Sequence, residues 1–173
     1  RTFAAAGRAA YDEITRVAAG RPLILMGTSL GTITALYLAA RFPIDGMVLR
    51  NPPPLRQLIV GRHGWWNLWV GAMLVSTQVP DYLCSIRNAS RCHGIPAVFI
   101  GSARDRLVPP QYQARIVKAY AGPKRIMRLR KGNHSSPMNT MEQIRFRREL
   151  QWLRERALKN VDAGLSANPV NPK

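Results

Sequence analysis

Short strand-like runs alternate along this chain with segments of helical character, and this alternation constrains the fold more than any other feature. Three runs are apolar throughout, as expected of strands buried on both faces, and a fourth alternates basic with apolar residues, as expected at a sheet edge. In chain order the expected strands are residues 23–26, 46–49, 97–100 and 125–129. The expected helices are residues 3–19, 32–41, 110–120 and 140–158. This order predicts an α/β fold, in which a parallel sheet carries helices on both faces.

The domain organisation is inferred from the chain length and from changes in composition and periodicity along the sequence. A chain of 173 residues corresponds to one domain, at about 100–200 residues per domain. Residues 1–160 are expected to form it, with an insertion at about residues 55–92 that mixes tryptophan with glycine and has poor periodicity. The Asn- and Pro-rich residues 161–173 are expected to form a flexible tail. No apolar run approaches the roughly 20 residues that cross a bilayer.

The net charge of +17, from 26 basic and 9 acidic residues, favours contact with polyanions. The basic residues are dense only at residues 124–131 and 145–156, and neither stretch has the interleaved aromatics of RNA-recognition modules. We therefore expect a solvated basic surface that adheres nonspecifically to polyanions, with no specific nucleic-acid partner.

The cysteine content predicts neither a disulfide scaffold nor a metal site. Cys84 and Cys92 are the only cysteines, and His93 is adjacent to Cys92 whereas His63 lies far upstream. We expect two unpaired thiols in a reducing compartment, or one opportunistic disulfide. The expected location is the cytoplasm, or the periphery of a membrane, and no cofactor is expected.

The first expected strand runs into the sequence G-T-S-L-G, which fits the pattern G-x-S-x-G between a strand and a helix. Such a turn is sharp and strained, so that Ser29 pushes its hydroxyl out of the sheet, and its glycines must be small because strand and helix crowd there. The backbone N–H of Leu30, at the helix N-terminus, would face an oxygen bound over Ser29 and donate to it in an oxyanion hole. An ordinary strand-to-helix turn is the alternative. The other members of this nucleophile elbow are Gly27, Thr28 and Gly31.

Two further strand ends carry polar residues suited to catalysis. Asp105 follows the third expected strand, where a carboxylate can orient a histidine and stabilise the imidazolium. Its alternative roles are a helix cap or a surface salt bridge with Arg104 or Arg106. His134 follows the fourth strand, in a loop of Gly, Asn and Ser rather than on an apolar face. Ser29, Asp105 and His134 are therefore the candidate catalytic triad.

The serine–acid–histidine order of these residues resembles the α/β-hydrolases, and most closely the serine-aminopeptidase-like and monoglyceride-lipase-like branch. The resemblance covers roughly residues 3–158. It rests on L-I-L-M-G-T-S-L-G-T at 23–32, I-P-A-V-F-I-G-S-A-R-D-R-L-V-P at 95–109 and K-G-N-H at 131–134. It implies Ser29 as nucleophile, His134 as general base and then acid, and Asp105 as the residue that orients His134. Some families of this fold place the acid after the preceding strand, where this chain has Asn51.

The resemblance also implies that residues 55–92 are a short helical cap between the sixth and seventh strands of the family's sheet. Trp65, Trp66, Trp69 and Met73 would then line a pocket for an acyl group, pack the cap onto the sheet, or contact a membrane surface. Only the last four of the family's eight strands are recognisable. The earlier strands and the second oxyanion donor would precede Arg1, so the chain is expected to be part of a longer polypeptide.

The sequence thus predicts a serine hydrolase that cleaves an ester, thioester or amide of a small-molecule acyl substrate through an acyl-enzyme. Three alternatives stay open. The chain is a catalytically silent fragment or pseudo-enzyme, it is a basic protein that binds polyanions or lipid surfaces on the same fold, or it is an acyltransferase, which uses the same triad.

Overall fold

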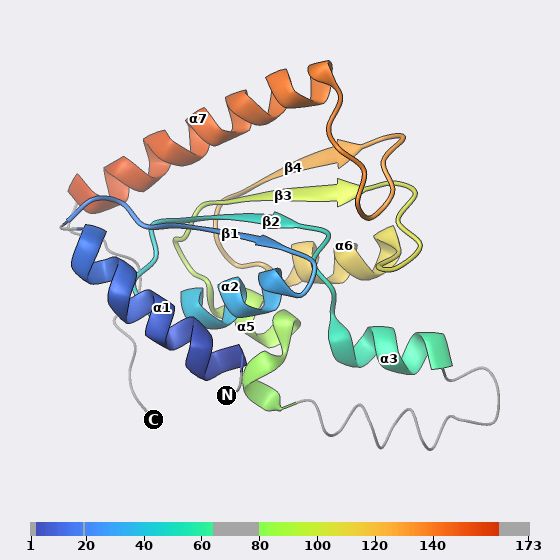
Figure 1. The fold of residues 1–173 in the computed structure, drawn as a ribbon, viewed down its shortest axis with the longest axis horizontal. Coiled ribbons are helices and arrows are strands. Elements are labelled where there is room, and N and C mark those ends of the chain that lie inside the picture. Colours follow the sequence, from blue (N-terminus) through green and yellow to red (C-terminus); the bar gives the residue numbers. More distant parts are fainter. Residues whose placement is uncertain (1–2, 19, 64–79, 163–173) are drawn as a thin grey trace.

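The computed structural model describes residues 3–18, 20–63 and 80–162, which form a parallel sheet between two layers of helices (Figure 1). The strands pair in the order β1-β2-β3-β4, and every pairing is parallel. They are β1 (Ile24–Thr28), β2 (Gly46–Arg50), β3 (Ala97–Ser102) and β4 (Lys124–Leu129). The predicted α/β class and the predicted position of the fourth strand at a sheet edge are both confirmed.

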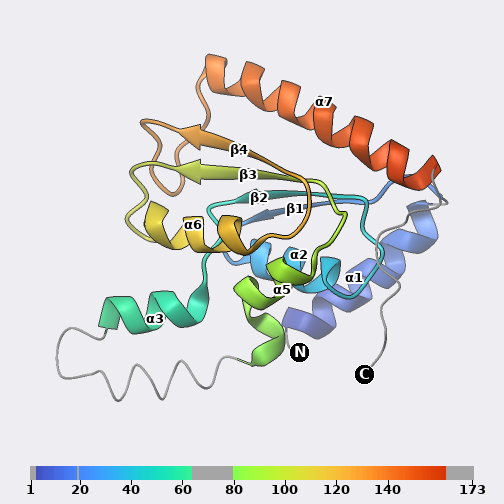
Figure 2. The same cartoon turned by 180° about the vertical axis from the view of Figure 1, so that it is seen from behind.

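The helices divide between the two faces of the sheet. One face carries α2 (Gly31–Ala39), α5 (Ser85–Arg91) and α6 (Pro110–Ala119), and α1 (Phe3–Ala18) packs on α2 in this layer. The other face carries the long helix α7 (Thr140–Asp162), as Figures 1 and 2 show from opposite sides. The helix α3 (Leu55–His63) leads away from the carboxyl end of β2, and a short 3-10 helix η1 (Asp81–Leu83) precedes α5.

Each face of the sheet is covered by its own hydrophobic cluster, which explains why β2 is apolar from Gly46 to Leu49 and β3 from Ala97 to Gly101. Side chains of successive strand residues point to opposite faces. Leu49 and Phe99 are buried among residues of α2, α5 and α6, whereas Val48 and Val98 are buried with Leu153 of α7. A strand between two such layers has no position at which a polar side chain reaches water.

β1 departs from the expectation that it is buried on both faces. Met26 is 67% exposed, although its partner in the register, Val48, is buried. Among the described residues β1 pairs only with β2, and α7 packs on β2, β3 and β4. The apolar run of β1 therefore predicts the strand correctly and its burial wrongly, because burial depends on what covers the sheet.

The inserted segment is divided between two environments. Residues 64–79 lie outside the described residues, so the expected cap is seen only at its two ends. From Ser85 onward the segment belongs to the main core, because Ala89 and Cys92 are fully buried in the cluster beneath the sheet. In this helical layer α5 packs against α2 and α6. At the other end of the chain, α7 continues to Asp162, two residues into the expected tail.

Within the described ranges, no helix is long and apolar enough to cross a membrane. Both cysteines are free.

The two thiols are expected to differ sharply in reactivity. Burial raises the pKa of the Cys92 thiol to about 12, and the thiol donates to the Asn88 carbonyl at 3.2 Å, whereas Cys84 is only half-buried. Because the thiolate is the reactive form, a disulfide reagent at neutral pH should modify no more than one thiol of the native chain and two after denaturation. Cys84→Ala should abolish the native reaction and Cys92→Ala should preserve it. Rapid modification of native Cys92 would contradict its place in the core.

Candidate active site

Three of the predicted residues lie close to the carboxyl ends of the strands, on one side of the sheet. Because all the strands are parallel and in register, Thr28, Ser102 and Leu129 end their strands on the same side. Ser29 follows the first of these residues directly, and Asp105 and His134 lie in the loops after β3 and β4. Ligands of open α/β sheets bind at this edge.

Ser29 occupies a strained turn, as the G-x-S-x-G pattern predicts. Its φ of 51° lies in the left-handed region, where a residue with a side chain costs on the order of 1–3 kcal/mol. The turn is held on both sides. The Ser29 N–H donates to the Arg50 carbonyl at 2.8 Å, and the Ser29 carbonyl accepts from the backbone and hydroxyl of buried Thr32 at 3.0 and 2.6 Å. This strain is stored at the position where the sequence predicts a nucleophile.

The two glycines of the elbow differ in their surroundings. A Cβ added to Gly27 would lie 2.7 Å from the carbonyl carbon and oxygen of Gly31 and 2.8 Å from the backbone nitrogen of Thr32, all of them backbone atoms. No described heavy atom lies within 4 Å of a Cβ added to Gly31. Crowding thus explains the glycine at 27, and the same explanation is wrong for the glycine at 31.

Leu30 lies between Ser29 and the first residue of α2, with helical φ and ψ of −56° and −31°. Among the described residues its N–H has no hydrogen-bond acceptor. A free backbone N–H at a helix N-terminus favours negative charge, because the helix dipole adds to the hydrogen bond. Leu30 therefore has the surroundings required of an oxyanion donor.

Asp105 and His134 are in direct contact. His134 Nδ1 lies 2.7 Å from Asp105 Oδ2, and the Asp105 side chain is fully buried. The carboxylate accepts further hydrogen bonds from the backbone N–H groups of Leu107 and Val108, both at 2.9 Å to Oδ1, and from Gln113 Nε2 at 3.2 Å to Oδ2. Such a set of donors fixes the orientation of the carboxylate and stabilises its charge.

The alternative roles of Asp105 do not describe this geometry. Its carboxylate forms no ion pair with Arg104 or Arg106 within the described part of the chain, and it does not cap α6, whose N-terminal flanking residue is Pro109 without a side-chain cap. The two backbone hydrogen bonds instead hold the loop before Pro109. One carboxylate oxygen, Oδ1, accepts from the loop backbone, and the other, Oδ2, contacts His134.

Asn51 is one of the residues of this site whose contacts the sequence did not predict. It is fully buried, has a φ of 48° and follows β2 directly. Its Nδ2 donates to the His134 carbonyl at 2.9 Å, and its Oδ1 accepts from the Ser102 N–H at 2.9 Å. The side chain thus joins the histidine loop to the ends of β2 and β3. The only sequence signal was its position after a strand, in the place where some families of the fold carry the acid.

Ser29 is connected to the histidine loop through the end of β2. Arg50 accepts the Ser29 N–H with its carbonyl, and its guanidinium donates to the carbonyl of Ser136. Asn51, the next residue, holds His134. No hydrogen bond joins the side chains of Ser29 and His134 in the described residues. Catalytic hydrogen bonds are often long without substrate and tighten in the complex.

Trp65, Trp66, Trp69 and Met73, assigned to the acyl pocket, lie outside the described residues. In the ranges that are described, no three His, Cys, Asp or Glu side chains cluster as metal ligands would.

Replacing Asn51 should impair catalysis more than folding. We expect Asn51→Gly to lower kcat by about 10²-fold, because an ångström-scale displacement of His134 has an effect of that order. Glycine tolerates the positive φ, so the loss would come from the two hydrogen bonds alone. The measurement is kcat and KM at a matched folded fraction. Thr15→Gly in exposed α1 is the control for a comparable loss of stability, and equal kcat values for the two variants would contradict the positioning role.

Comparison with family models and with curated protein sequences finds no match for this chain. Solved structures do match. The monoacylglycerol lipase of Paleococcus ferrophilus aligns over 90% of this chain and 76% of its own, with a TM-score of 0.61 and 18% identity. An alpha/beta hydrolase enzyme from a sediment metagenome of the lagoon of Mar Chica, Morocco, aligns over 87% and 68%, with a TM-score of 0.58 and 18% identity.

A third match is the acetyl xylan esterase 1 of Thermoanaerobacterium sp., which aligns over 76% of this chain with a TM-score of 0.57 and 16% identity. This chain spans only 46% of that esterase. At such identities the similarity establishes the fold: the chain has an α/β-hydrolase fold and covers part of the length of its structural neighbours.

Proposed function

We propose that this chain carries the catalytic triad of a serine hydrolase, with Ser29 as nucleophile, His134 as general base and acid, and Asp105 as the residue that orients His134. The observation that carries the proposal is the 2.7 Å contact between His134 Nδ1 and buried Asp105 Oδ2, at the sheet edge where Ser29 occupies its strained turn. The fold of neighbouring esterases and lipases supports the same reaction class.

The contact between Asp105 and His134 determines which imidazole nitrogen can act as the base. With Nδ1–H donating to Asp105, Nε2 carries the lone pair. Nε2 takes the proton of Ser29 while Oγ attacks the acyl carbon and the carbonyl bond opens to an oxyanion, to which the Leu30 N–H donates. The imidazolium then protonates the leaving group as the bond between carbon and leaving group breaks.

The second half of the cycle repeats these roles with water. His134 Nε2 removes a proton from water, the resulting hydroxide adds to the acyl-enzyme, and the acyl–Oγ bond breaks as Ser29 regains its proton. The products are a carboxylic acid and an alcohol, thiol or amine. We favour esters among the substrates, because an alkoxide leaves more readily than an amide nitrogen, and the matched lipase and esterase are named for ester chemistry.

A fluorophosphonate probe tests the proposal directly, because it reacts with a serine that is activated by a histidine. The expected result is one adduct per chain by intact mass, and none with Ser29→Ala. Ser135→Ala, which removes an exposed hydroxyl from the histidine loop, is the matched control and should label like the unmodified chain. A folded chain that gives no adduct, or an adduct that survives Ser29→Ala, would overturn the proposal.

A further inference from the structure

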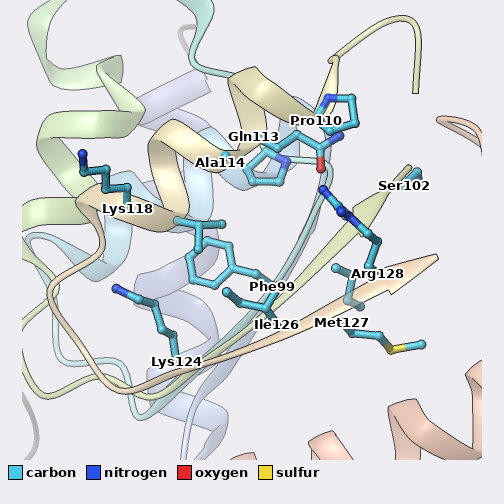
Figure 3. Close-up of a pocket in the computed structure, with 14 residues that line it drawn as sticks. Phe99, Ser102, Pro110, Gln113, Ala114, Lys118, Lys124, Ile126, Met127 and Arg128 are labelled. Atoms are coloured by element: carbon cyan, nitrogen blue, oxygen red, sulfur yellow. The ribbon is translucent and has the colours of Figure 1, made fainter. Parts of the chain in front are cut away.

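A cavity whose lining includes none of Ser29, Asp105 and His134 lies between α6 and the edge of the sheet. It has a volume of about 350 Å³, which is within the range of about 300–1,000 Å³ found for small-molecule sites. Its walls come from the face of β3 and β4 that α6 covers only in part (Figure 3). The described residues that line it include no aspartate or glutamate.

The floor and sides of this groove are apolar. Phe99 of β3 and Ile126 of β4 are partners in the register and point to the same face, and Ala114 of α6 lies opposite them. Val117 of α6 also lines the groove. Ile126 is 54% exposed, whereas its register partner Phe99 on the same face is 1% exposed. β4 is the edge strand, so α6 leaves an apolar strip open to water. An exposed apolar concavity of this kind is typical of a ligand site.

Cationic side chains stand at the ends of the groove. Lys118 and Lys124 lie at one end, and Arg128 and Gln113 lie at the other (Figure 3). Lys124 Nζ donates to the Tyr120 carbonyl at 2.7 Å, which fixes its ammonium near the mouth. A ligand with an apolar body and an anionic end group complements both the walls and the charge.

We propose that this groove binds a medium-chain fatty-acid anion, with the carboxylate between Lys118 and Lys124 and the acyl chain along Phe99 and Ile126. The proposal concerns a site separate from Ser29 and does not depend on catalysis. Its test is a direct measurement of binding, so it can fail while the chain is still a hydrolase, and it can succeed if the chain is not.

The probe is decanoate, used below its micellisation concentration and followed by calorimetry on the full chain. We expect saturable binding of one decanoate per chain, weaker binding of uncharged decanol, and none of inorganic phosphate. Ala114→Trp, which fills the groove from an exposed position of α6, should abolish the binding. Lys118→Glu should weaken it on the order of fivefold, as reversal of an exposed charge pair does. Lys159→Glu, on the far side of the sheet, is the charge-matched control.

Three results would overturn the proposal. They are no binding of decanoate, binding that Ala114→Trp leaves unchanged, and binding of phosphate as strong as that of decanoate, which would show a response to charge alone. If Ala114→Trp fails to fold, Ile126→Glu replaces it, because Ile126 is already half-exposed and a glutamate there opposes both the acyl chain and the carboxylate.

Discussion

Asp105→Asn is expected to lower kcat about 10⁴-fold and to leave the fold intact, which is the effect of the same change in well-studied serine triads. The geometry of this chain supplies the reason. Asp105 Oδ1 accepts two backbone N–H groups, and Oδ2 faces His134 Nδ1 and Gln113 Nε2. An asparagine has only one oxygen to place. Keeping it against the two backbone donors puts its NH₂ group opposite His134 and Gln113.

That arrangement changes the tautomer of the histidine. The NH₂ group can only donate, so His134 Nδ1 must become the acceptor and Nε2 must carry the proton. An Nε2–H cannot take the proton of Ser29, and the rate falls although every heavy atom stays near its place. The loss should appear in kcat and in the rate of fluorophosphonate labelling, both measured at a matched folded fraction.

The control is Asp12→Asn, an exposed carboxylate of α1 that pairs only loosely with Arg8 at 3.7 Å. It loses the same charge and should keep full activity. Activity of Asp105→Asn within tenfold of the unmodified chain would mean that Asp105 does not set the tautomer of His134. The observed contact would then be structural.

The strand ends could be predicted from sequence because the signals are local. An apolar run followed by G-x-S-x-G needs no knowledge of distant residues, and neither does an aspartate or a histidine placed just after a strand. The α/β fold supplies the rest, since parallel strands bring such positions to one edge. The sequence alone therefore predicts Ser29, Asp105 and His134 as a set.

Asn51 and Gln113 could not be identified in this way. Asn51 acts on His134, 83 residues further along the chain, and Gln113 contacts Asp105 from inside a helix. Neither contact leaves a pattern in the sequence, because an asparagine before three prolines reads as a turn and a glutamine in α6 reads as surface. The prediction that Met26 is buried is wrong for a related reason. Hydropathy predicts the strand, and only the packing of α7 determines which part of the strand is covered.

Substitution of Gly27 is expected to lower both the stability and the activity of the chain, and substitution of Gly31 is the matched comparison. Gly27→Ala should lower the free energy of unfolding by about 1–3 kcal/mol, as overpacking does, because its methyl group meets only backbone atoms of the elbow that cannot rotate away. Relief of the clash must move the turn that carries Ser29. We expect kcat to fall about 10²-fold as a consequence.

Gly31→Ala adds the same methyl group four residues later, as the first residue of α2, where no described atom lies within 4 Å. It should leave the free energy of unfolding unchanged or raise it by about 0.5–1 kcal/mol, because alanine loses less entropy than glycine in a helix. Denaturant unfolding of the two variants measures the difference. Equal destabilisation would contradict the explanation that backbone crowding requires the glycine at 27, because neither glycine has a positive φ. A clear difference would mean that the close approach of the Gly31 and Thr32 backbone is what requires a glycine at position 27.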